Sequence, residues 1–171
     1  MKKLQKHIFL IGFMGVGKTS TSRELNRMLG VQEIDTDAVI VEQECMAINE
    51  IFAGRGEEYF RQVETELIDS LKTKEPCIVS CGGGMVMRQE NVAAMKEQGT
   101  ICLLTASPET IYEHVKDSTD RPLLVGHMNI PYITEMMQAR EPKYRAAADV
   151  VVDTDGCSPA EVAKKLIAEL G

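Results

Sequence analysis

The sequence predicts an α/β protein in which one parallel sheet is covered by helices on both faces. Apolar runs bounded by turn residues recur along the chain, at residues 8–11, 31–34, 77–79, 101–104 and 150–152. Such near-continuous apolar strands are typical of sheets that are buried on both sides. Longer stretches of helical period separate the runs, and strands that alternate with helices form parallel pairs. Ligand-binding groups are then expected at the carboxyl ends of the strands.

A glycine-rich segment follows the first apolar run. Residues 12–19 read Gly-Phe-Met-Gly-Val-Gly-Lys-Thr and lead into a helix expected over residues 19–29. They match the pattern G-x-x-x-x-G-K-[ST] at every fixed position. The glycines let consecutive N–H groups point inward at a helix N-terminus, where a triphosphate binds. Lys18 then reaches the outer phosphates, and the Thr19 hydroxyl can ligate Mg²⁺.

Length and charge restrict the kind of protein. The chain has 171 residues and a formal net charge of −7, which fits one domain over residues 1–171. Nonspecific binding to nucleic acid or to an acidic membrane needs a broad basic field, so neither is expected. The apolar run that follows the basic N-terminus is too short for a signal peptide or a membrane span. We expect a cytoplasmic monomer.

Cysteine spacing is consistent with a reduced compartment. The five cysteines form no C-x-x-C pair and have no histidine at ligand spacing, so neither a zinc site nor a disulfide framework is expected. Cys77 and Cys102 lie in apolar runs, where a thiol acts as a small hydrophobe.

The remaining elements are predicted by periodicity and capping residues. Apolar side chains at three- and four-residue spacing predict an amphipathic helix over residues 56–74. Ser107 and Ser158 are each followed by proline and an acidic first turn, which indicates helix starts. Another helix is expected from near Pro131. Residues 117–129 contain charge, Pro122 and Gly126 without a clear period, which predicts a mobile loop.

Polar and glycine-rich segments follow the second and third runs. Asp35 and Asp37 follow the second, where carboxylates either cap a helix or serve a magnesium ion and a substrate hydroxyl. Residues 82–84 are three consecutive glycines after the third run. They allow a ligand to approach the backbone closely, or they form a flexible turn.

Arginines are the cations available to this acidic protein for binding an anion. Arg61 has Glu57, Glu58 and Glu64 at helical spacing, and Arg140 has Glu135 and Glu141 nearby, so surface ion pairs are the alternative for both. Arg121 lies in the expected loop without a regular helical partner and reads better as a phosphate clamp.

Taken in order, these motifs resemble the shikimate kinase family. The resemblance spans the chain and rests on residues 12–19, Asp35-x-Asp37, Phe60-Arg61, Gly82-Gly83-Gly84, Arg121-Pro122-Leu123-Leu124 and Arg140-x-x-x-Tyr144-Arg145. It implies a three-layer P-loop kinase fold, with a five-stranded parallel sheet flanked by helices. It also implies a small substrate-binding helical region at about residues 36–62 and a lid at about residues 117–130.

The resemblance implies the reaction as well: phosphorylation of the 3-hydroxyl of shikimate by ATP with Mg²⁺, in aromatic amino-acid biosynthesis. ATP phosphates would be held by Gly15, Val16, Gly17, Lys18, Thr19 and Ser20. Thr19 and Asp35 would hold the metal. The catalytic residues would be Lys18, Asp37 and Arg121, the last contributed to the ATP by the lid. Asp37, Arg61, Gly83 and Arg140 would bind shikimate, the two arginines through its carboxylate.

The chain departs from the family around the adenine. The lid after Leu124 is short, and His114 lies near a position where some members have an arginine that covers the base. Cys157 falls where the family passes the adenine with backbone and small side chains. It is therefore assigned to the ATP site, with a plain loop cysteine as the alternative.

Three other functions are alternatives to a shikimate kinase. A gluconate or nucleotide kinase of the same architecture is the nearest, but Arg61 and Arg140 favour a compact carboxylated substrate. A GTPase needs the guanine-reading pattern N-K-x-D, which is absent. A noncatalytic relative would be expected to have lost Lys18, Asp35 or Asp37, and all three are present.

Overall fold

The computed structural model describes residues 4–116 and 129–171. Five parallel strands form one sheet in the order β2-β3-β1-β4-β5, which confirms the predicted fold class. The strands are β1 (His7–Ile11), β2 (Glu33–Asp35), β3 (Ile78–Ser80), β4 (Gly99–Thr105) and β5 (Val150–Asp153). β2 and β3 each lie one or two residues later than the apolar runs that predicted them.

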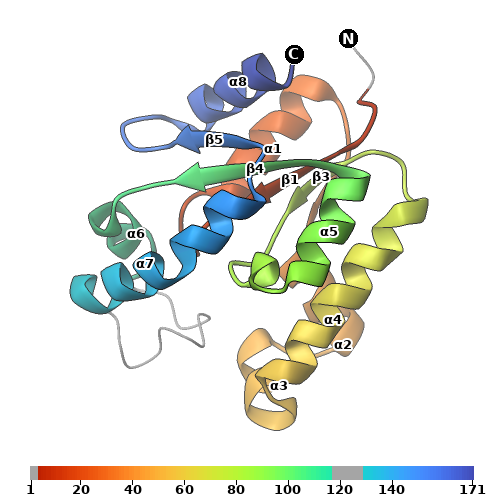
Figure 1. The fold of residues 1–171 in the computed structure, drawn as a ribbon, viewed down its shortest axis with the longest axis vertical. Helices are drawn as coiled ribbons and strands as arrows, with labels where there is room; N and C mark the ends of the chain where they lie inside the picture. Colours follow the sequence, from red (N-terminus) through yellow and green to blue (C-terminus); the bar gives the residue numbers. More distant parts are fainter. Residues whose placement is uncertain (1–3, 117–128) are drawn as a thin grey trace.

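Helices cover both faces of the sheet (Figure 1). Figure 1 shows α1 and α8 on one side of the sheet and α5 and α7 on the other. The α-helices are α1 (Lys18–Leu29), α2 (Thr36–Glu44), α3 (Ile48–Arg55), α4 (Glu57–Ser70), α5 (Gln89–Gln98), α6 (Pro108–Val115), α7 (Ile130–Ala147) and α8 (Pro159–Leu170). Two short 3₁₀ turns are η1 (Leu71–Thr73) and η2 (Met85–Met87).

The helix ends follow the expected chemistry. The Ser107 side chain accepts a hydrogen bond from the Thr110 N–H, and Ser158 forms a capping box with Glu161. The helix expected over residues 56–74 is α4, which ends at Ser70 and continues as the turn η1. No helix in the described part of the chain is both long and apolar enough to cross a membrane.

Two separate apolar cores support these elements. The larger core surrounds the sheet, in which every residue of β1 is buried. A smaller cluster lies between α2, α3 and α4 and consists of Ile40, Ile51, Phe60, Val63 and Leu67. The second half of α4 contributes Ile68 to the larger core. The helices α2 and α3 thus form the small helical region expected after the second strand.

The sheet order brings the functional segments to one edge. β1 lies between β3 and β4, and β3 pairs on its other side with β2. Ser80, the last residue of β3, is in register with both Leu10 and Asp35. Because these strands are parallel, the segments that follow β1, β2 and β3 meet at the same edge.

His7 anchors the start of this sheet. Its side chain is 4% exposed. The backbone N–H of Cys77 donates to His7 Nδ1 at 3.1 Å, and His7 Nε2 lies 2.9 Å from the Leu71 carbonyl oxygen. Since Nδ1 accepts a hydrogen bond, Nε2 carries the hydrogen and donates to Leu71. The ring therefore satisfies two backbone groups at the junction of β1, η1 and β3.

Replacing His7 by leucine should destabilise the fold. The apolar side chain would leave the Cys77 N–H buried without a partner and would remove one of the two hydrogen bonds to the Leu71 carbonyl, which also accepts from the Lys74 N–H. The expected cost is about 1–3 kcal/mol in the free energy of unfolding. Urea denaturation measures this loss. The exposed neighbour Lys6 provides the control, since Lys6→Leu should change the free energy by less than about 0.5 kcal/mol. Equal unfolding midpoints for the two variants would contradict the role of His7.

Candidate active site

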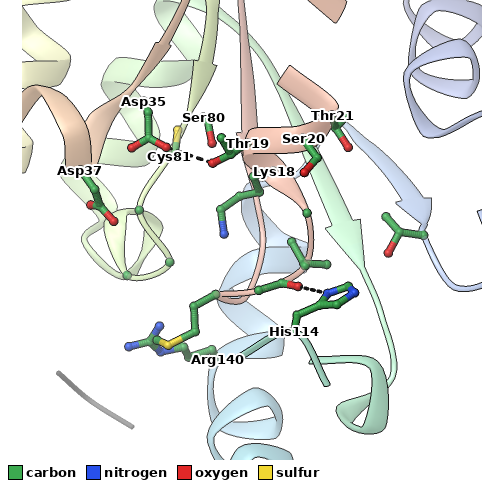
Figure 2. A pocket seen from close by; sticks show the side chains of 18 of the residues that line it. Lys18, Thr19, Ser20, Thr21, Asp35, Asp37, Ser80, Cys81, His114 and Arg140 are labelled. Atoms are coloured by element: carbon green, nitrogen blue, oxygen red, sulfur yellow. Dashed lines mark hydrogen bonds between the residues drawn. The ribbon is translucent and has the colours of Figure 1, made fainter. Parts of the chain in front are cut away.

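The loop between β1 and α1 has the conformation that its glycines allow. Gly15 has φ +83° and Gly17, the N-cap of α1, has φ +101°, both in the region that side chains disfavour. A Cβ on Gly15 would lie 2.5 Å from Val115 Cγ1, so α6 packs directly against the loop. His114, also on α6, hydrogen-bonds the Gly15 carbonyl through Nδ1 (Figure 2).

Lys18 lies across this loop. Its side chain is 9% exposed, and Nζ donates to the carbonyl oxygens of Gly12 at 2.7 Å and Phe13 at 3.1 Å. The expected phosphate-binding residues 15–20 line one cavity of about 770 Å³. The cavity also contains Asp35, Asp37, Arg61 and Arg140 in its walls. The sequence therefore identified residues that the fold does bring together.

Asp35 caps a helix, which is one of the two roles that its sequence context suggests, and it also contacts the phosphate loop. Its Oδ1 accepts the N–H of Ala38 at 3.1 Å, which caps α2, and its Oδ2 accepts the Thr19 hydroxyl at 3.0 Å (Figure 2). Two oxygen ligands at the rim of a phosphate loop suit Mg²⁺, which keeps water and phosphate ligands around it. Among residues 4–116 and 129–171 no group of three or more acidic, His or Cys side chains could enclose a metal. The residues therefore fit a magnesium ion that is bound together with a nucleotide.

The three glycines that follow β3, called the glycine turn here (residues 82–84), lie against charged side chains. A Cβ on Gly82 would lie 2.8 Å from Asp37 Oδ1 and 2.9 Å from Glu64 Oε2. Two carboxylates from α2 and α4 thus face the same peptide unit. The turn is a packed element of the site, in contrast to the flexible turn that was the alternative.

Arg61 and Arg140 reach the glycine turn from opposite sides. A Cβ on Gly84 would lie 2.6 Å from both Nη atoms of Arg61, and one on Gly83 would lie 3.3 Å from Nη1 of Arg140. The Arg140 guanidinium also lies 5.8 Å from the ring centroid of Phe13 in the phosphate loop. Two guanidiniums from α4 and α7 therefore pack on consecutive peptide units beside the phosphate loop.

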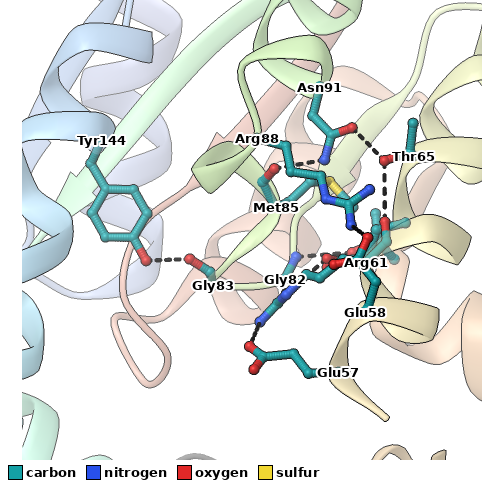
Figure 3. A network of polar contacts seen from close by, with 12 residues as sticks. Glu57, Glu58, Arg61, Thr65, Gly82, Gly83, Met85, Arg88, Asn91 and Tyr144 are labelled. Carbon is teal, nitrogen blue, oxygen red and sulfur yellow. Dashed lines mark hydrogen bonds and ion pairs between the residues drawn. The ribbon is translucent and has the colours of Figure 1, made fainter. Parts of the chain in front are cut away.

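The two arginines differ in the contacts that their guanidinium groups make within the protein. Arg61 Nη1 lies 2.7 Å from Glu64 Oε1. Its Nη2 lies 3.3 Å from Glu57 Oε1 (Figure 3). The ion pairs suggested as an alternative are thus real, yet Arg61 still lines the cavity. Within the described part of the chain, the buried Nη1 of Arg140 has no hydrogen-bond partner. An unsatisfied buried donor of this kind fits an anionic ligand.

Glu64 has an unusual environment for a carboxylate. Its side chain is fully buried, and Oε2 has no hydrogen-bond partner among the residues that the structure describes. Burial raises the pKa of Glu64 to about 7, and the charge of Asp37 adds to the effect, while Arg61 and Arg140 oppose it. Glu64 therefore takes up a proton far more readily than an exposed glutamate.

Three neighbours were not identified as site residues from the sequence. Glu64 was considered only as a surface partner of Arg61. The Tyr144 hydroxyl donates to the Gly83 carbonyl (Figure 3), and the Thr36 hydroxyl accepts the Gly82 N–H at 2.9 Å. Their signal in the sequence is weak. Tyr144 lies one helical turn after Arg140, and Thr36 is the middle residue of Asp-Thr-Asp.

Two other sequence assignments have different outcomes. Cys157 lines the cavity, as expected for the ATP site, and its sulfur accepts a hydrogen bond from Lys165 Nζ at 3.1 Å. Its contact with adenine stays a prediction. Arg121, and with it most of the lid expected at about residues 117–130, lies outside the described residues.

Comparisons with known proteins agree with this geometry. The family model described as shikimate kinase matches residues 14–171. A shikimate kinase of Thermodesulfovibrio yellowstonii is 43% identical over 164 residues, which cover 96% of this chain and 94% of that protein. The solved structure of the Acinetobacter baumannii shikimate kinase in complex with shikimate has a TM-score of 0.93 at 27% identity and covers 98% of this chain and 94% of that one. The Aquifex aeolicus shikimate kinase has a TM-score of 0.83 at 34% identity and covers 96% and 95%.

The buried carboxyl of Glu64 should make stability depend on pH. Its pKa rises from an ordinary 4.5 to about 7 on folding. Between these values the folded protein holds a proton that the unfolded chain has released, so the free energy of unfolding should fall as pH rises. Glu64→Gln should lack this component. Urea denaturation of both proteins at about pH 5 and about pH 8 measures the difference, and a difference that stays constant with pH would disprove the assignment.

Proposed function

This chain belongs to the shikimate kinase family, and we propose how its pocket catalyses the reaction. The reaction is transfer of the γ-phosphoryl group of ATP to the 3-hydroxyl of shikimate, a step in aromatic amino-acid biosynthesis. The products are ADP and shikimate 3-phosphate. The phosphate loop holds the nucleotide, and the glycine turn with its two arginines holds shikimate.

One observation supports this assignment most strongly. The phosphate loop and the pair Arg61 and Arg140 line the same cavity, and both guanidiniums lie against adjacent glycines. A planar pair of this kind suits a carboxylate, which it fixes in orientation as well as in position. A small ring carrying one carboxylate and several hydroxyls would then present a hydroxyl toward Asp37. The relative from Acinetobacter baumannii has been solved with shikimate bound.

The chemistry assigns a separate task to each group. Asp37 accepts the proton of the 3-hydroxyl as its oxygen forms a bond to the γ-phosphorus. The bond from that phosphorus to the bridging oxygen breaks, and ADP leaves with the electron pair. Lys18 moves from the loop carbonyls to the phosphates, where its charge offsets the developing negative charge. Because the transition state is loose, positioning contributes more than proton abstraction.

Magnesium and the lid complete the proposal. Thr19 and Asp35 would hold Mg²⁺, which supplies charge neutralisation at the phosphates when it is bound. Ser20, Val16 and the glycines of the loop would direct N–H groups at the same phosphates. Arg121 would contribute a further positive charge from the lid.

A direct assay tests the function. ADP release should be measured with shikimate, gluconate and a nucleoside monophosphate in parallel, with ATP and Mg²⁺ present. Of these three acceptors, we expect only shikimate to be phosphorylated. Equal turnover with gluconate would show that the two arginines do not select a carboxylated ring.

Replacing Lys18 by alanine should abolish turnover and leave the fold intact. Removal of one electrostatic contact to the transferring group costs about a thousandfold in kcat. Steady-state ADP release measures this loss, and circular dichroism checks the fold. Lys72→Ala is the matched control, because Lys72 is an exposed lysine that pairs with Asp69 at 3.5 Å and should keep full activity. Activity near that of the wild type in Lys18→Ala would refute the role of the loop.

Arg140→Ala should raise the KM for shikimate by about tenfold to a hundredfold, because a charge-assisted contact to the substrate carboxylate is lost. Arg61→Ala should do the same, but it also leaves Glu64 buried without its partner. Arg61→Ala, Arg140→Ala and the double variant should therefore all be made in a protein that also carries Glu64→Gln. In that protein the loss of Arg61 leaves no buried carboxylate unpaired, so the variants are destabilised less. If both arginines hold one carboxylate, the double change will cost less free energy than the sum of the single changes. Strict additivity would count against a shared ligand.

A further inference from the structure

The Gly82 amide has a partner that is not part of the sheet. Along β3 and beyond, successive N–H groups point to alternate sides. The Cys81 N–H donates to the Leu10 carbonyl of β1 at 3.0 Å, so the Gly82 N–H points toward the side of β2. There β2 has already ended, because its last residue, Asp35, is in register with Ser80. The Gly82 N–H donates instead to the Thr36 hydroxyl at 2.9 Å.

The Thr36 hydroxyl thus replaces a main-chain carbonyl. Thr36 has no exposed surface, so water does not compete for this hydrogen bond. The arrangement lets α2 begin directly after Asp35 without leaving a buried N–H of the glycine turn unpaired. The Thr36 hydroxyl is not needed to cap α2, because Asp35 already caps this helix through the Ala38 N–H.

This hydrogen bond joins the start of α2, which carries Asp37, to the glycine turn. Thr36 lies between Asp35, which contacts Thr19 of the nucleotide half, and Asp37. On the other side of the bond, Gly82 lies directly against Asp37, since its Cβ would be 2.8 Å from Asp37 Oδ1. A shift of the glycine turn relative to α2 would therefore move Asp37 relative to the substrate.

We propose that Thr36 is a positioning residue of the phosphoryl transfer, whose buried hydroxyl fixes the glycine turn against α2 and so sets Asp37 toward the substrate hydroxyl. This inference rests on the proposed function. The Tyr144 hydroxyl holds the next carbonyl of the turn, at Gly83, from α7. The glycine turn is thus hydrogen-bonded by Tyr144 from α7 and by Thr36 from α2. Thr36 is the one of the two that lies next to Asp37, the proton acceptor.

The test compares Thr36→Val, which keeps the shape and loses the hydroxyl, with Thr36→Ser, which keeps the hydroxyl. Misplacement of a reacting group by about 1 Å can cost a hundredfold in rate, so kcat with shikimate should fall about tenfold to a hundredfold in Thr36→Val. The KM for ATP should stay within about twofold, because the phosphate loop is untouched. Thr36→Ser should restore kcat. If the valine variant does not fold, Thr36→Ala takes its place.

Two controls separate positioning from loss of structure. The rate of each variant is divided by its concentration of nucleotide-binding sites, so that unfolded protein does not lower the value of kcat. Thr134→Val removes another threonine hydroxyl, which donates to the Ile130 carbonyl within α7 at 2.8 Å, and should leave kcat unchanged. Hydrogen exchange of the Gly82 amide should be slow in the wild type and in Thr36→Ser, and fast in Thr36→Val.

The outcomes are distinct. Full kcat in Thr36→Val together with fast exchange at Gly82 would overturn the inference and leave the proposed function standing. An inactive Thr36→Ser with a protected Gly82 amide would also overturn it. A wild-type protein that does not phosphorylate shikimate would refute the proposed function itself.

Discussion

The site depends on the absence of side chains in residues 82–84. The positions that Cβ atoms would take at Gly82, Gly83 and Gly84 lie 2.6 to 3.3 Å from charged atoms of α2, α4 and α7. A side chain at any of these positions would force at least one of the charged atoms to move away. Opposite charges therefore converge on three consecutive peptide units. The backbone itself serves as the surface on which the substrate pocket is built.

An acidic protein must bind two anionic substrates, and it does so with few cations. The net charge of −7 repels them at long range, so attraction has to come from groups that lie next to the ligand. Lys18 rests on loop carbonyls, which compete only weakly with phosphate. Arg61 is held by Glu57 and Glu64, which fixes its orientation before a ligand arrives but neutralises much of its charge. Arg140, by contrast, has a buried Nη1 without a hydrogen-bond partner in the described part of the chain, so this donor is available to a carboxylate.

Sequence patterns predicted the parts of this site that are determined locally. The phosphate loop could be predicted because its conformation follows from glycines within one short segment. Arg61 could be placed on a helix, with Glu57 and Glu64 one turn away. That Glu64 is buried could not be predicted, because its burial depends on the contact of α4 with α2 and with the glycine turn, which are distant in sequence. The contact of Thr36 with Gly82 could not be predicted either, since the two residues lie 46 positions apart in the chain.

The apolar cores that stabilise the fold are distinct from the polar contacts that position the groups around the substrate. The apolar cluster under α2 and α3 is distinct from the core around the sheet, and α4 contributes to both. Asp37 and Arg61 therefore sit on a unit whose packing against the sheet is limited. Polar contacts connect this unit to the nucleotide half through Asp35 and Thr19, and to the glycine turn through Thr36 and Gly82. A directional hydrogen bond fixes position more narrowly than an apolar contact does, because its strength falls steeply with misalignment. The accuracy with which the reacting groups are placed thus depends on a few buried hydroxyls and carboxylates rather than on the size of the core.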